Sequence, residues 1–162
     1  MCTQMEPIKQ VIESLDQYIK AYNEQNDSPH ILFQTALIEE EVDEYIVGHK
    51  EKETFPVMLN RFREERNLTP KDLYTRSWID RRLYSQIMGE RNYQPAKNTA
   101  IAFGLGLHLN PSDMELLLSS AGLSINKTSE FDLIISFCLE RKIFDISTVN
   151  QLLFYRKQPL LR

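Results

Sequence analysis

The feature that most constrains the fold of this chain is a helix-start pattern that occurs three times. An apolar residue precedes a capping residue, and a second apolar residue follows four positions after the cap. The copies are Leu68-Thr69-Pro70-Lys71-Asp72-Leu73, Ile79-Asp80-Arg81-Arg82-Leu83-Tyr84 and Leu109-Asn110-Pro111-Ser112-Asp113-Met114. Thr, Asp and Asn side chains accept hydrogen bonds from the free N–H groups of a first turn, and the apolar pair packs around the cap. The pattern therefore predicts helices that begin at residues 70, 81 and 111.

Apolar residues at three-four spacing predict further helices on both sides of these three. Two long helices are expected over residues 7–22 and 29–48, joined by a polar turn at 23–27 as an antiparallel hairpin. A shorter helix is expected over residues 56–66, where Asn67 can adopt the left-handed conformation that ends helices. Two more are expected in the tail, one from a capping box at Ser129 and Asp132 and one beginning at Asp145 or Ser147.

Residues 100–109 are ambiguous, because their apolar residues alternate as they would in a strand. The same stretch contains Gly104 and Gly106, and no second strand pattern exists that could pair with it. We therefore expect a helix that packs closely against its neighbours through the glycines. With that assignment every predicted element is helical, and the fold class is all-α.

The charge of the chain is unevenly distributed. The formal net charge of −4 argues at face value against a nucleic-acid partner. However, residues 1–55 carry a net charge of −8, residues 56–97 one of +4 and residues 98–162 none, and arginine is absent before Arg61. Such asymmetry suggests that an acidic segment and a basic segment have separate tasks. The alternative, two solvated faces that simply differ in charge, stays open.

Several classes of protein are excluded or disfavoured. No apolar run approaches the roughly 20 residues that cross a bilayer, and the N-terminus lacks the features of a signal peptide. Cys2 and Cys138 form no disulfide framework, so we expect a cytoplasmic protein without a membrane partner. His30, His49 and His108 lack metal-ligand spacing, and no glycine-rich phosphate loop or nucleophile elbow is present. We therefore expect no metal, no cofactor and no enzymatic activity.

The helices expected at 70–76 and 81–88 are joined by a tight connection and carry the most informative residues. The second helix exposes four side chains of the kind that read bases: Arg81, Arg82, Ser85 and Gln86. Arginine can bond to guanine through two hydrogen bonds, and glutamine can do the same with adenine. In helix-turn-helix proteins the N-terminal part of the second helix contacts base edges. The loop that follows it offers Arg91 and Lys97, which suit phosphate contacts.

Residues 55–122 resemble the lambda-repressor-like helix-turn-helix domain of Cro-type and XRE-type bacterial and phage regulators. The likeness rests on residues 68–73 and 79–87, on Gly89 and Pro95, and on the closing helix around 100–107. It implies that helix 81–88 lies in the major groove of double-stranded DNA, with base reading by Arg81, Arg82, Ser85 and Gln86. It also implies phosphate contacts by Lys71, Arg91, Asn92 and Lys97. The turn position that this family usually fills with glycine is Trp78 here.

Three segments are expected: an acidic N-terminal hairpin (1–50), a five-helix helix-turn-helix domain (55–122) and a two-helix C-terminal extension (123–162) that packs on the core or dimerises. The resemblance implies a homodimeric, sequence-specific transcriptional regulator. The alternative is a helical protein–protein interaction module whose acidic residues 39–44 bind a partner or mimic DNA, with the helix-turn-helix fold not used for DNA. In a third possibility, the acidic hairpin competes with DNA for the basic face.

Overall fold

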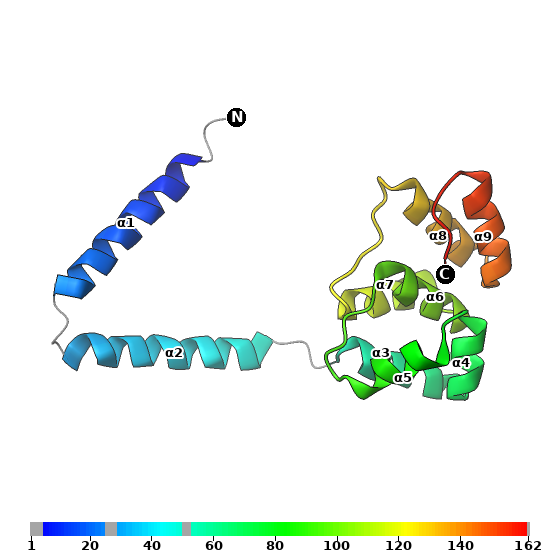
Figure 1. The fold of residues 1–162 in the computed structure, drawn as a ribbon, viewed down its shortest axis with the longest axis horizontal. Coiled ribbons are helices and arrows are strands. Elements are labelled where there is room, and N and C mark those ends of the chain that lie inside the picture. Colours follow the sequence, from blue (N-terminus) through cyan, green and yellow to red (C-terminus); the bar gives the residue numbers. More distant parts are fainter. Residues whose placement is uncertain (1–4, 25–28, 50–52, 162) are drawn as a thin grey trace. The chain divides into compact units, whose positions relative to one another are not determined.

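The computed structural model describes residues 5–24, 29–49 and 53–161, and every regular element in them is an α-helix (Figure 1). The fold class is therefore all-α, as predicted. The chain divides into two units, Met1–Lys50 and Glu51–Arg162. The turn expected at residues 23–27 lies largely outside the described residues.

The first unit contains α1 (Met5–Glu24) and α2 (Pro29–His49), so both predicted N-terminal helices are confirmed. All side chains described between residues 11 and 21 and between 35 and 49 are exposed. They include the apolar ones of both helices, such as Leu15 at 53% and Ile38 at 57% exposure. The packing of one helix on the other that a hairpin implies stays a prediction.

The second unit contains seven helices within its described residues. They are α3 (Phe55–Glu65), α4 (Pro70–Arg76), α5 (Arg81–Gly89), α6 (Lys97–Gly106), α7 (Pro111–Ser120), α8 (Glu130–Glu140) and α9 (Ile146–Tyr155). The core sits around α6, which packs against α4, α7 and α9 and is buried throughout residues 100–106. The C-terminal helices join the same core through residues such as Ile135, Cys138 and Val149.

The two glycines of α6 explain how a helix can be buried on all sides. A Cβ atom at Gly104 would overlap the side chain of Met114 on α7, and one at Gly106 would overlap Oγ of Ser77 at the end of α4. A helix buried around its whole circumference has no polar face, so it lacks the usual helical period. The predicted close packing through glycines is therefore confirmed, and the alternating pattern has a physical explanation.

The predicted caps form at the starts of α4, α5 and α7. Thr69 and Asp72 make a complete capping box, Asp80 accepts from the backbone N–H of Arg82 at 2.7 Å, and Asn110 caps α7. Asp145, one of the two residues expected to open the last helix, caps α9.

The capping box expected at Ser129 forms only in part. Oγ of Ser129 accepts weakly from the N–H of Asp132 at 3.4 Å, but the Asp132 carboxylate does not return the bond. It accepts instead from the N–H of Asn126 and from Nζ of Lys97, both at 2.5 Å. A long-range partner that local spacing cannot reveal has replaced the local one.

Six helices of the second unit end in the same way. The residue after each C-cap has a left-handed backbone, with φ between 52° and 67°, at Asn67, Trp78, His108, Gly122, Lys142 and Lys157. In each case the next N–H donates to the carbonyl five residues earlier, as in Ile79 N–H to Tyr74 O at 2.9 Å. This is the Schellman motif, in which glycine is the usual left-handed residue. Among the six only Gly122 is glycine, and the predicted left-handed Asn67 is confirmed.

Candidate nucleic-acid interface

The second helix of the expected DNA-binding pair, α5, is fixed to the core by one face. Tyr84 and Ile87 are buried, and the ring of Tyr84 lies 5.7 Å from Tyr74 of α4 and 6.1 Å from Phe103 of α6, between ring centroids. Ile79, in the turn before α5, is buried as well. These contacts determine which side chains of α5 point outward.

The outward face of α5 carries Arg81, Arg82, Ser85 and Gln86, all exposed. Residues four apart on a helix are neighbours, so the four side chains form two adjacent pairs on one face. Within the described residues, none of them makes a side-chain hydrogen bond or an ion pair. The four predicted base-reading residues therefore share one surface and keep their donors and acceptors free.

Three of the four predicted phosphate-contacting residues are exposed. Lys71 lies in the first turn of α4, and Arg91 and Asn92 lie in the loop between α5 and α6. Lys97 differs, because its Nζ lies 2.5 Å from Oδ2 of Asp132, whose side chain is only 1% exposed. Sequence reasoning could not separate Lys97 from the others, since its partner is 35 residues away.

The basic residues on α3 have structural partners. Nη2 of Arg61 lies 2.9 Å from Glu53 Oε2, Nη1 of Arg63 donates to the carbonyl of Leu68 at 2.6 Å, and Arg66 faces Asp113 at 3.6 Å. The exposed basic residues between 56 and 97 that form no ion pair with another described residue are Lys71, Arg76, Arg81, Arg82 and Arg91. The free positive charge is thus carried by α4, α5 and the loop after α5.

The turn between α4 and α5 contains Trp78, whose φ is 55° and whose side chain is 54% exposed. This is the backbone conformation that glycine adopts most easily. The chain therefore makes the turn without a glycine, and the indole ring is left at the surface.

Comparisons with models of known protein families, with curated proteins and with solved structures give no match to this chain.

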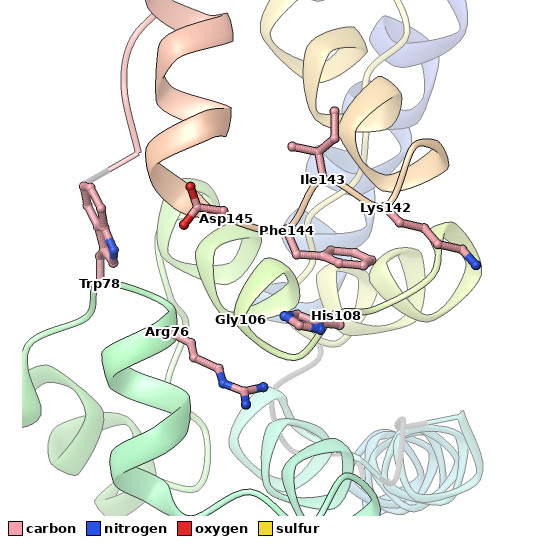
Figure 2. A pocket seen from close by; sticks show the side chains of 8 residues that line it. All are labelled: Arg76, Trp78, Gly106, His108, Lys142, Ile143, Phe144 and Asp145. Carbon is pink, nitrogen blue, oxygen red and sulfur yellow. The ribbon is translucent and has the colours of Figure 1, made fainter.

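A second site lies at the C-terminal end of α4 and was not predicted from the sequence (Figure 2). It is a hollow of about 600 Å³, lined by Arg76, Trp78, Gly106, His108, Lys142, Ile143, Phe144 and Asp145. The rings of His108 and Phe144 stack with 4.6 Å between centroids and 9° between planes. Burial, followed by the charges of Arg76 and Arg66, lowers the pKa of His108. No local spacing signals this site, because its residues come from the ends of α4, α6 and α8 and from the start of α9.

Another hollow, of about 610 Å³, lies between α3 and α5. Its lining includes Asn60 and Arg63 from α3, Tyr84 and Met88 from α5, and Arg91 from the loop after α5. Burial raises the pKa of Tyr84 above its ordinary value. Arg91 is also one of the exposed basic residues without an ion pair, so this hollow borders the predicted DNA-contacting surface around α5.

Three findings concern other kinds of site in the described part of the chain. No three His, Cys, Asp or Glu side chains there lie close enough to hold a metal ion. Burial raises the pKa of Cys138 to about 11, so its thiol stays protonated at neutral pH. None of the helices in the residues that the structure describes is both long and apolar enough to cross a membrane.

Proposed function

We propose that this protein is a sequence-specific DNA-binding transcriptional regulator that inserts α5 into the major groove. In this proposal α3 to α7 form the five helices of a lambda-repressor-like domain. The observation that carries it is the surface of α5, where Arg81, Arg82, Ser85 and Gln86 are exposed together without intramolecular partners. Arginine and glutamine in the first turns of such a helix have the donor geometry to distinguish bases in the major groove.

Phosphate contacts would come from the residues around α5. Lys71 and Arg91 are exposed and free of ion pairs to described residues, and Asn92 is exposed beside Arg91. The N-terminus of α6 adds backbone donors, because Ala96 at its cap provides no side-chain hydrogen bond. A helix N-terminus with free N–H groups favours a phosphate oxygen. Lys97 is left out of this set by its ion pair with Asp132.

The proposal includes a homodimer, because a single helix in the groove reads few base pairs. Two copies of α5 in successive major grooves would lie roughly 34–36 Å apart and recognise a palindromic site. The full 162-residue chain is the appropriate species for the test. Selection of bound DNA from a random pool at about 50 mM salt should enrich a palindrome with that spacing. A pool that stays random after repeated rounds would refute the proposal.

A second candidate function is supported by the first unit. Glu39, Glu40, Glu41, Asp43 and Glu44 are all exposed on α2. The same helix exposes apolar side chains, including Tyr45 at 65% and Val47 at 82%. A surface that combines acidic and large apolar side chains could bind a protein partner. It could also mimic the negative charge of the DNA backbone.

Charge removal on α2 separates these possibilities. In the triple variant Glu39→Gln, Glu40→Gln, Glu41→Gln the helix keeps its shape and loses three negative charges. Tighter DNA binding would show that α2 competes with DNA for a basic surface. Unchanged DNA binding together with loss of a stoichiometric protein partner would support the interaction module.

A further inference from the structure

We propose that the hollow between the ends of α4, α6 and α8 binds a small organic anion with a planar ring, of the aromatic carboxylate class. This is a binding function separate from DNA recognition, and it does not depend on α5. The hollow is the one drawn in Figure 2, with a volume of about 600 Å³. That volume lies within the range of about 300–1,000 Å³ typical of small-molecule sites.

The charge of the lining favours an anion. Arg76 contributes a cation that forms no ion pair with another residue in the described part of the chain, whereas the Lys142 side chain extends away from Arg76 and His108 (Figure 2). Asp145 is the one acidic residue in the lining. Its carboxylate is already engaged as the cap of α9, accepting from the N–H and the hydroxyl of Thr148 at 2.9 and 2.8 Å. A carboxylate on the ligand would offer Arg76 the two-point hydrogen bonding that a guanidinium prefers.

The aromatic part of the lining favours a planar ring. His108 and Phe144 form a stacked pair inside the hollow, and Trp78 lies at its edge with half of its surface exposed. Aromatic rings associate by offset stacking or by edge-to-face contact, which adds to the burial of apolar area.

The site is built on rigid helix ends. Trp78, His108 and Lys142 are the left-handed residues that follow α4, α6 and α8. Each of these three ends is closed by the long Schellman hydrogen bond: Ile79 N–H to Tyr74 O at 2.9 Å, Leu109 N–H to Gly104 O at 3.1 Å and Ile143 N–H to Cys138 O at 2.8 Å. A preformed site loses little conformational entropy when a ligand binds.

Trp78 provides a direct readout, because it is the only tryptophan in the chain. The full chain is titrated with benzoate while tryptophan emission is recorded, and the same titration is followed by calorimetry in case the ring does not respond. We expect saturable binding of benzoate. Benzamide, which lacks the charge, and cyclohexanecarboxylate and inorganic phosphate, which lack the planar ring, should each bind at least about tenfold more weakly.

The variant Arg76→Gln should weaken benzoate binding by about tenfold or more. Arg81→Gln is the matched control, since Arg81 is an exposed arginine on α5 outside the hollow, and it should leave benzoate affinity unchanged. Absence of a calorimetric signal up to about 10 mM benzoate would overturn the proposal. Equal affinity for benzamide or for phosphate would also overturn it, as would wild-type affinity in Arg76→Gln.

Discussion

Nζ of Lys97 on α6 lies 2.5 Å from Oδ2 of Asp132 on α8, whose side chain is 1% exposed. The same oxygen accepts from the backbone N–H of Asn126, which lies in the segment before α8. One carboxylate thus joins the end of the α5–α6 loop to the C-terminal helices. An ion pair of this kind is costly to break from one side, because a buried charge is left without a partner.

Lys97→Ala should therefore destabilise the protein by about 2 kcal/mol, below the usual range for fully buried pairs because Lys97 is partly exposed. Urea unfolding of the variant and the wild type measures the difference. Lys71→Ala is the control, since Lys71 is exposed and forms no ion pair with a described residue; its effect should stay within about 0.5 kcal/mol. Equal stabilities of the two variants would contradict the structural role of Lys97.

A second prediction follows from the close packing of Gly106 against Ser77. A Cβ at Gly106 would overlap Oγ of Ser77 and would lie 3.2 Å from its Cβ and its backbone N. Gly106→Ala should cost about 1–3 kcal/mol in free energy of unfolding through overpacking. Oγ of Ser77 is buried without a hydrogen-bond partner in the structure, so Ser77→Ala alone should be close to neutral.

The double variant Gly106→Ala, Ser77→Ala decides whether that overlap is the cause. Removal of Oγ takes away the shortest of the three contacts, so the double variant should recover part of the lost stability. Thermal unfolding of the two single variants and the double variant completes the cycle. Additive losses would show that Cβ or the backbone N of Ser77, and not its hydroxyl, meets the new methyl group.

A third prediction concerns the left-handed residues at the helix ends. Substitutions at two of them should change the free energy of unfolding in opposite directions. Lys157 has φ 56° and is exposed after α9, whereas Gly122 has φ 67° after α7 and open space where a Cβ atom would stand. Side chains disfavour this conformation by about 1 kcal/mol. Lys157→Gly should therefore stabilise the protein and Gly122→Ala should destabilise it, each by up to about 1 kcal/mol in urea unfolding.

Lys127→Gly is the control for the effect of introducing a glycine at a position without a left-handed backbone. Lys127 is exposed and is not among the residues with positive φ. Glycine at position 127 relieves no backbone strain in the folded state and increases the conformational entropy of the unfolded chain. This variant should therefore be as stable as the wild type or less stable. A stabilising Lys127→Gly would show that the gain at Lys157 has another origin than the backbone.

Much of the fold follows from local signals in the sequence, and much of the candidate interface does not. Caps such as Thr69, Asp80 and Asn110 act within one turn, so their pattern places the helix starts correctly. The left-handed ends at Trp78, His108 and Lys142 carry no glycine and therefore no local signal. Their meeting in one hollow depends on how three helices pack, as does the pairing of Lys97 with a residue 35 positions away.

His108 makes a pH-dependent contribution to stability. Burial, then the charges of Arg76 and Arg66, lowers its pKa in the folded state, so the unfolded chain binds its proton more readily. The contribution of neutral His108 to the free energy of unfolding is fully present above the ordinary histidine pKa of about 6.5. It decreases as the pH falls below that value. Asn also tolerates the left-handed backbone, so His108→Asn keeps the turn and removes the titration.

Urea unfolding of the wild type and His108→Asn at pH 7.5 and near pH 5.5 measures this contribution. The other titrating groups are common to both proteins and largely cancel in the comparison. The variant should lose less stability than the wild type on acidification. An identical loss in both proteins would mean that His108 is protonated as easily when folded as when unfolded.

The proposed DNA interface makes different predictions for its two classes of residue. Arg81→Ala, on the exposed face of α5, should weaken binding to the selected DNA by about 1–3 kcal/mol and relax the preference at one base position. Arg91→Ala, in the loop after α5, should weaken binding to all sequences alike. It should also lower the slope of log affinity against log salt by about 0.9. Lys97→Ala should leave that slope unchanged, because Asp132 already holds the Lys97 ammonium group.

Fluorescence anisotropy with the selected site and with a scrambled site, over a range of salt concentrations, measures both quantities. Lys127→Ala is the control, as an exposed lysine far along the chain from α4 and α5. This variant removes one positive charge outside the proposed interface. It therefore distinguishes the loss of a phosphate contact from the effect of a lower net charge on DNA binding. If Arg81→Ala weakened binding to both sites equally, α5 would contact the phosphates and not the bases. A salt slope that fell as much in Lys127→Ala as in Arg91→Ala would show non-specific attraction by the whole chain.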